Sequence, residues 1–164
     1  MDIEVLKGNS FDFDGHPIKV IDLKPNEMVH STGYYIPELK TYVAGDQVFY
    51  KTHAYIAAGT NYPEPWIASL KEVRDNFEIT NVVPGHGPVD EADKVFKSAI
   101  EYLQAYATIY APLKKQSIIA KEMLAKYPDY ALKEVLFMTT GAAVTAPDLI
   151  EMMKGNLGFA ENKH

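Results

Sequence analysis

Three short segments pair a histidine or an aspartate with glycine beside a predicted strand, a setting in which proteins often place metal ligands. They are Val29-His30-Ser31-Thr32-Gly33, Val43-Ala44-Gly45-Asp46 and Val82-Val83-Pro84-Gly85-His86-Gly87-Pro88. A strand fixes the backbone next to the side chain, and glycine lets the adjoining loop bend tightly around an ion. Imidazole and carboxylate together suit zinc, manganese or iron. We therefore interpret His30, Asp46 and His86 as candidate metal ligands.

Each segment also has a simpler explanation. A single histidine is more often a surface or hydrogen-bonded core residue than a ligand, and a Gly-Asp pair most often forms a turn. The Pro-Gly-His-Gly-Pro run could be a tight connection in which the histidine is incidental. The chain has no cysteine, so a metal site must use histidine and carboxylate. The order and spacing of the three segments favour the ligand interpretation.

The elements that must position these segments form one predicted domain, residues 1–164, with a sheet-rich part at 1–89 and a helical part at 90–155. The predicted strands are Ile3–Leu6, Ile18–Leu23, Tyr34–Ile36, Thr41–Ala44 and Ile79–Val83. Asp14-Gly15 is typical of a hairpin turn, and a second hairpin is expected at residues 37–40. Pro84-Gly85 is expected to end the last strand.

Helices are predicted from apolar residues at helical spacing. The first covers Pro65–Phe77, and a longer one begins after Asp90, its predicted N-cap, and carries an apolar stripe from Phe96 to Tyr110. Two further helices are expected around residues 119–127 and 130–138. A fresh helix start is expected at Thr145-Ala146-Pro147-Asp148.

In their order and spacing, the three ligand segments resemble the second half of the metallo-β-lactamase superfamily. There, His-Ser/Thr-x-Gly precedes a hairpin, Gly-Asp ends the next strand, and Pro-Gly-His-Gly follows a helix and a strand. The resemblance covers about residues 15–89. It implies an α/β (α+β) fold that is a half or truncated version of an αββα sandwich, with a mostly antiparallel sheet and a helical C-terminal extension. It also implies zinc as the cofactor, with His30 on the first metal, Asp46 bridging both and His86 on the second.

The sequence departs from the family pattern in two ways. Val29 stands where glycine is common, and no His-x-His-x-Asp-His segment lies upstream of His30, where only His16 is found in a predicted turn. A zinc centre needs three or four protein ligands. We therefore expect zinc binding to be weak or absent in this chain alone, and hydrolysis to be absent or impaired.

Two classes of function follow. In the first, the chain is the C-terminal half of a metal-dependent hydrolase of small-molecule esters, thioesters, amides or phosphoesters, active only with an N-terminal half. In the second, it is a non-catalytic assembly or binding module. A half-sandwich would expose the inner face of its sheet, so the second hypothesis predicts a homodimer formed through that face.

The composition of the chain argues against nucleic-acid and membrane partners. The chain has 164 residues and a formal net charge of −6, and its densest basic stretch is Lys114-Lys115. We therefore expect no nucleic-acid partner. No apolar run reaches the ~18 residues of a membrane span, so no membrane partner is expected. A cytoplasmic location is expected, and a periplasmic one is possible if a natural upstream signal exists.

Two further residues have competing interpretations. His53, seven residues after Asp46, resembles a histidine near the active site in one branch of the superfamily, where it would lie behind the ligands or touch substrate. It could equally be a loop histidine. Trp66 is the only tryptophan. It is expected to anchor its helix on the sheet rather than to form a substrate wall.

Overall fold

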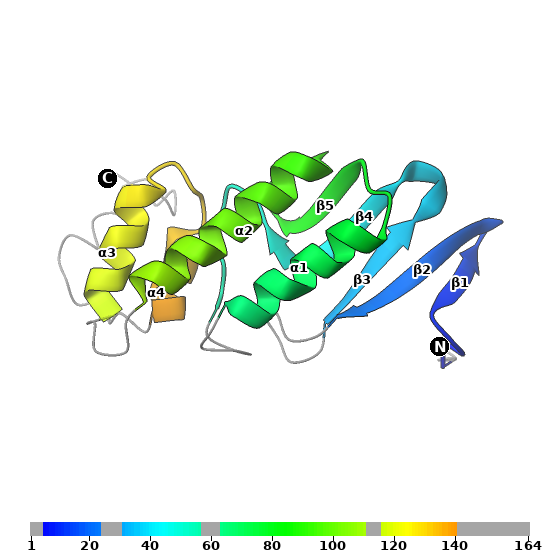
Figure 1. Ribbon diagram of the computed structural model, residues 1–164, viewed down its shortest axis with the longest axis horizontal. Coiled ribbons are helices and arrows are strands. Elements are labelled where there is room, and N and C mark those ends of the chain that lie inside the picture. The colour runs from blue at the N-terminus through cyan, green and yellow to red at the C-terminus, as the bar shows by residue number, and fades with distance from the viewer. Residues whose placement is uncertain (1–4, 24–30, 57–62, 111–115, 141–164) are drawn as a thin grey trace, which may run out of the picture.

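A single six-stranded sheet, with its strands in sequence order, forms the centre of the computed structural model, which describes residues 5–23, 31–56, 63–110 and 116–140 (Figure 1). The strands are β1 (Ser10–Phe13), β2 (His16–Leu23), β3 (Ser31–Ile36), β4 (Thr41–Phe49), β5 (Asn81–His86) and β6 (Asp90–Glu91). All neighbours pair antiparallel except β4 and β5, which are parallel. The prediction of a mostly antiparallel sheet is confirmed.

The first hairpin turns at Asp14-Gly15, as predicted. Both residues have positive φ, 53° and 86°, which Asp and Gly tolerate at a tight hairpin turn. The prediction of a strand at residues 3–6 is wrong for its described part, because Val5 and Leu6 are exposed and lie outside any strand. The strand that pairs with β2 is Ser10–Phe13, which the turn fixes in register.

The β5 strand differs from its prediction in length. It runs through Pro84 and Gly85 to His86 instead of stopping at Pro84. The parallel pairing with β4 shifts register between Val43 and Gly45 and again before Phe49. Proline is tolerated at such irregular positions because the regular hydrogen-bond ladder is interrupted there.

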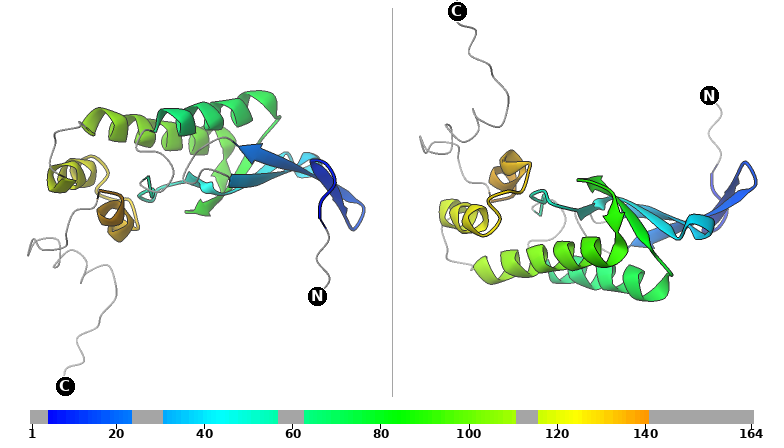
Figure 2. Two further views of the ribbon diagram at one scale, coloured as in Figure 1. Left: turned by 90° about the horizontal axis from the view of Figure 1, so that it is seen from below. Right: turned by 90° about the horizontal axis from the view of Figure 1, so that it is seen from above.

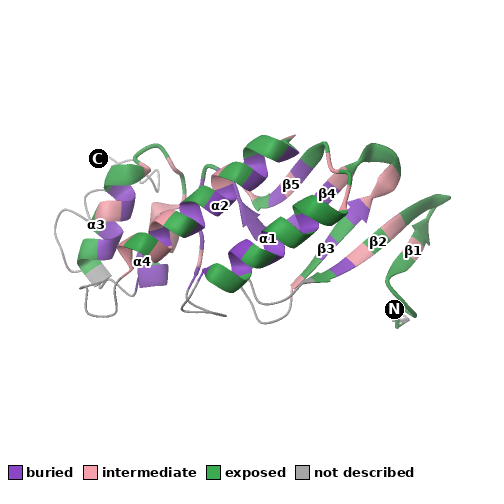
Figure 3. Cartoon of the chain, in the orientation of Figure 1, coloured by how far each residue is buried: buried purple, intermediate pink, exposed green. Residues whose placement is uncertain are grey.

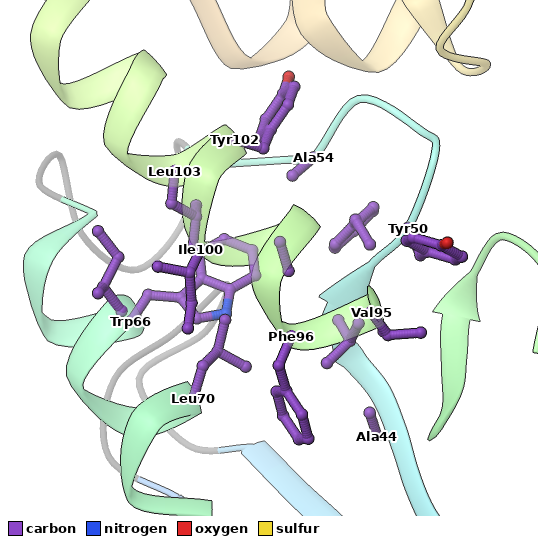
Figure 4. Packing of buried hydrophobic residues seen from close by; sticks show 14 of the residues in the cluster. Ala44, Tyr50, Ala54, Trp66, Leu70, Val95, Phe96, Ile100, Tyr102 and Leu103 are labelled. Carbon is purple, nitrogen blue, oxygen red and sulfur yellow. The ribbon is translucent and has the colours of Figure 1, made fainter. Parts of the chain in front are cut away.

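Helices α1 (Glu64–Asn76) and α2 (Ala92–Ile109) pack together on one face of the sheet (Figure 2). Their apolar sides meet β4 in a shared core, where Trp66, Leu70 and Phe96 are at most 1% exposed (Figure 4). Two shorter helices, α3 (Gln116–Lys126) and α4 (Lys133–Thr140), lie beyond the end of α2. The predicted helix start at residues 145–148 lies outside the described residues. Among the described helices, none is long and apolar enough to cross a membrane.

The predicted N-cap of α2 is wrong by one residue. Glu91 is the N-cap and makes no side-chain capping bond. Asp90 instead lies in β6 and pairs with Val82 of β5. Its carboxylate accepts hydrogen bonds from the Glu91 backbone and the Tyr50 hydroxyl. The carboxylate that could have capped the helix is therefore held by the sheet.

The second face of the sheet carries no helix among the residues that the structure describes (Figure 2). Tyr35 and Tyr42 pair across β3 and β4 and contact Phe77 and Phe96, which identifies their face as the one under the helices. Alternate residues point the other way. They form an open-face patch in which Tyr34 is exposed and the other side chains are partly buried: Phe11, Ile18, Val20, Tyr34, Val43 and Val83. Figure 3 shows that β1 and β2 consist mostly of exposed and intermediate residues. An exposed apolar sheet face was expected of a half-sandwich.

Candidate metal centre

Asp46 and His86 come together where β4 and β5 run side by side. The His86 Nε2 atom lies 3.2 Å from the Asp46 Oδ1 atom, and the two side chains are 43% and 55% exposed. Two residues that are forty positions apart in the sequence therefore converge on one open site. His30 lies outside the described residues. The strand expected after it begins at Ser31.

The approach of the two strands depends on glycine at position 85. A Cβ atom there would lie 2.5 Å from the Gly45 carbonyl carbon and 2.6 Å from the Asp46 Oδ1 atom. Both distances are far below van der Waals contact. Only a residue without a side chain allows β5 to pass this close to the Asp46 carboxylate. The glycine of the Pro-Gly-His segment thus has a definite steric role.

The His86 ring is held by stacking on the Phe49 ring. Their centroids are 4.8 Å apart and the planes are inclined by 19°. The backbone adds a second constraint, because the Tyr50 N–H donates to the His86 carbonyl oxygen at 2.9 Å. Phe49 in turn packs edge-on against Trp66 of α1. The imidazole orientation is therefore linked to the core.

The strand beneath Asp46 is fixed by contacts to Gln47. The Trp66 Nε1–H donates to the Gln47 backbone oxygen at 2.8 Å, and the Tyr42 hydroxyl donates to the Gln47 side-chain oxygen. Gln47 and Tyr42 are fully buried and Trp66 is 1% exposed. Trp66 thus anchors α1 on the sheet, as expected. The same bond fixes the backbone next to the candidate ligand.

The spacing of the pair fits zinc. With Zn–N and Zn–O bonds of ~2.0–2.2 Å, two ligands of a tetrahedral ion lie ~3.4 Å apart. The observed 3.2 Å between His86 Nε2 and Asp46 Oδ1 is close to this value. In the part of the chain that the structure describes, no group of three or more His, Cys, Asp or Glu side chains could hold a metal ion. The described pair therefore supplies two donors and needs others.

A polar cluster borders the loop that follows His86. The Tyr50 hydroxyl donates to Asp90 Oδ2 at 2.9 Å, and the Lys51 ammonium lies 3.9 Å from the same oxygen. Hydrogen bonds from the Glu91 backbone and Tyr50 lower the pKa of Asp90, and burial raises the pKa of Tyr50. Asp90 is thus kept ionised and fastens β6 to the end of β4.

His53 lies in a buried aromatic cluster. It is fully buried, its Nδ1 atom is 2.9 Å from the Tyr102 hydroxyl, and its ring contacts those of Tyr102 and Tyr130. Burial lowers the pKa of His53 to about 4, with a smaller contribution from Lys133. Its Nε2 atom has no hydrogen-bond partner among the described residues. These contacts give His53 a role in joining the sheet to the helical part.

The sequence interpretation missed the residues that support the ligands. Phe49 and Gln47 occur in an ordinary apolar stretch of β4, and nothing in their spacing distinguishes them. Gly85 could have been recognised, because a glycine directly before a candidate ligand suggests a close backbone approach.

Comparisons with known proteins identify the fold. No protein-family model and no curated protein matches the sequence. The structure is similar to a metallo-beta-lactamase from Pontibacter korlensis, with a TM-score of 0.51, 19% identity, and coverage of 63% of this chain and 48% of that chain. It is also similar to a metallo-beta-lactamase family protein from Thermus thermophilus, with a TM-score of 0.53, 16% identity, and coverage of 84% and 49%.

These matches define the class of fold. The chain has the metallo-β-lactamase fold in part, as a mostly antiparallel sheet with helices on one side, which confirms the fold that the sequence resemblance implied. It spans about half the length of both solved structures.

Proposed function

We propose that this chain is the part of a metallo-β-lactamase-type hydrolase that supplies Asp46 and His86, together with His30, to a zinc centre. The observation that carries the proposal is the 3.2 Å approach of His86 Nε2 to Asp46 Oδ1 at an open site. The 164 residues contain no His-x-His-x-Asp-His segment, so the proposal requires further donors from another segment or chain. The chain alone is accordingly expected to be inactive or impaired.

The chain's own residues would act by holding and orienting the donors. Phe49 fixes the plane of the His86 ring, and Gly85 leaves room for the Asp46 carboxylate. Zinc bound at such a site supplies Lewis acidity toward water and the scissile carbonyl or phosphoryl group. The substrate class is a small-molecule ester, thioester, amide or phosphoester. The net charge of −6 makes a nucleic-acid substrate the least favoured choice.

Zinc titration of the purified chain at pH 7, followed by calorimetry, tests this proposal. We expect weak binding that His86→Ala and Asp46→Asn each reduce about tenfold or more, as loss of one donor from an already sparse site should. The control is His16→Ala. His16 lies in the first hairpin, is exposed and pairs with Glu38, which lies outside that hairpin. Unchanged zinc affinity in the His86→Ala variant would show that the ligand assignment is wrong.

A second candidate function rests on a different observation, the open-face patch on the sheet. A non-catalytic assembly module needs such a surface and needs no metal. The two candidates differ in what removal of zinc does. The hydrolase loses its reactive centre, whereas the module keeps its assembly.

A further inference from the structure

The open-face patch is continuous across five strands. Phe11 lies opposite Ile18, Val20 opposite Tyr34, and Tyr34 opposite Val43, while Val43 pairs with Val83 of β5. The Phe11 and Tyr34 rings contact each other edge to face, with centroids 6.4 Å apart. Each strand from β1 to β5 thus contributes an apolar side chain at a matching height. The patch extends across the sheet and is not a set of scattered exposed residues.

Its exposure contrasts with the other face. Tyr42 and Val82, which point toward the helices from β4 and β5, are fully buried. On the open face Tyr34 is 40% exposed, and Phe13, next to the patch on β1, is 66% exposed. The other five members of the patch are partly buried. A contiguous apolar surface that is left partly open to solvent can mark an interaction site. The patch is therefore suited to bury itself against another apolar layer.

The patch has no charged member. His16 and Asp22 lie on the same face of β2 but at the two ends of that strand, and His16 is paired with Glu38. A surface that meets its own copy across a twofold axis must not place like charges opposite one another. The chain as a whole carries a net charge of −6, so its negative charges lie outside the patch. This distribution suits self-association.

We propose that the open-face patch binds the same patch of a second copy of this chain, giving a symmetric dimer with sheet packed on sheet and the helices outside. The match covers about half of each similar structure, and a second copy of this chain presents an apolar face of equal size. Two sheets packed in this way lie ~10 Å apart with strands inclined by roughly 30°. The inference rests on the second candidate function and requires no zinc.

The test is the oligomeric state of the full chain, measured by sedimentation velocity over a range of micromolar concentrations with a chelator present. We expect a reversible monomer–dimer equilibrium. Raised salt concentration should not weaken it, because the interface contains apolar contacts and no ion pairs. A monomer at every concentration, or soluble species of no fixed size, would overturn the proposal.

Substitutions at Tyr34 locate the interface. Tyr34→Lys places a charge in the patch, and it should raise the dimer dissociation constant about tenfold or more, because the lysine would be buried in the apolar interface without an opposite charge. Tyr34→Phe keeps the apolar ring and should leave the dimer intact. Met138→Lys is the matched control, since Met138 is 65% exposed on α4 and lies outside the patch. Circular dichroism of each variant confirms folding.

The outcomes separate this inference from the hydrolase proposal. A dimer that persists in the His86→Ala variant but is lost in Tyr34→Lys supports the patch and leaves the zinc question to the titration. A dimer that Tyr34→Lys does not weaken, or that Met138→Lys weakens equally, overturns the patch as the interface. Zinc binding by a monomer would support the hydrolase proposal alone.

Discussion

At the scale of residues, the geometry of the candidate centre depends on the absence of a side chain at Gly85 as well as on the rings and carboxylate that are present. Asp46 and His86 are both about half exposed, so solvent alone would leave their side chains mobile. The stacked ring of Phe49 restricts His86, and the absence of a side chain at Gly85 leaves the room in which the Asp46 carboxylate can approach it. Metal affinity should therefore respond to residues that carry no donor atom.

Gly85→Ala tests the steric part of this idea. The added methyl carbon would lie 2.6 Å from Asp46 Oδ1, so the carboxylate or the strand must move. We expect zinc affinity to fall about tenfold, in line with the loss of an outer-shell support. Gly8→Ala controls for backbone strain without a clash at the site, because Gly8 has a φ of 100° and its added methyl group would meet nothing within 4 Å. Equal zinc affinity in Gly85→Ala and the parent chain would contradict the steric argument.

Phe49→Leu tests the stacking. Leucine keeps the site apolar but gives the His86 imidazole no aromatic plane, so we expect several-fold weaker zinc binding with a stability loss of only ~1 kcal/mol. Phe77→Leu is the matched control, because Phe77 packs on Tyr35 instead of His86. If both variants bind zinc alike, His86 is oriented by its backbone alone.

Asp46 and His86 could be selected from the sequence as candidate ligands because glycine and proline mark chain conformation locally. Asp46 and His86 each follow a glycine at an expected strand end, and this pattern survives without tertiary information. The role of Phe49 was not predictable, since its partner His86 is distant in sequence and the two meet only through parallel pairing of β4 and β5. The same pairing explains why β5 continues through Pro84.

At the scale of elements, the segment after β4 joins the sheet to the short helices. Thr52 forms a parallel bridge with Ala131, and the His53 N–H donates to the Ala131 carbonyl oxygen at 2.9 Å. The His53 side chain packs between Tyr102 of α2 and Tyr130, which precedes α4. The attachment of the helical part therefore depends on keeping this histidine neutral.

The attachment should be sensitive to acid. Burial lowers the pKa of folded His53 to about 4, whereas the unfolded chain takes up the proton near 6.5. The contribution of neutral His53 to the free energy of unfolding is therefore complete above pH 6.5. It is lost as the pH falls toward 4, and the loss amounts to ~3 kcal/mol at most. Urea unfolding across this window measures it. His53→Gln should flatten the pH dependence, whereas His16→Gln, at an exposed position, should not.

At the scale of the whole molecule, the sheet-rich and helical parts share one core. The buried cluster runs from Ile21 in β2 to Phe137 in α4 without division. The division at residue 89 was drawn from composition, because β-branched and aromatic residues dominate before it and helical periodicity follows it. Composition and periodicity indicate most of the strands and helices but cannot show which of them pack together. Helix α4 packs beside the segment that follows β4. This packing depends on contacts such as the hydrogen bond that the Thr139 hydroxyl donates to the Ala54 carbonyl oxygen.

A shared core predicts a single cooperative unfolding transition for residues 1–164. Trp66 is the only tryptophan and is buried between α1 and β4, so its fluorescence reports on the sheet-rich part, whereas far-ultraviolet circular dichroism reports mainly on the helices. The two melting curves should coincide. Leu136→Ala in α4, where Leu136 is fully buried, should lower both by the same amount, equivalent to ~2–5 kcal/mol. A tryptophan transition unmoved by Leu136→Ala would mean that the sheet and the short helices fold independently, and the domain would have to be divided.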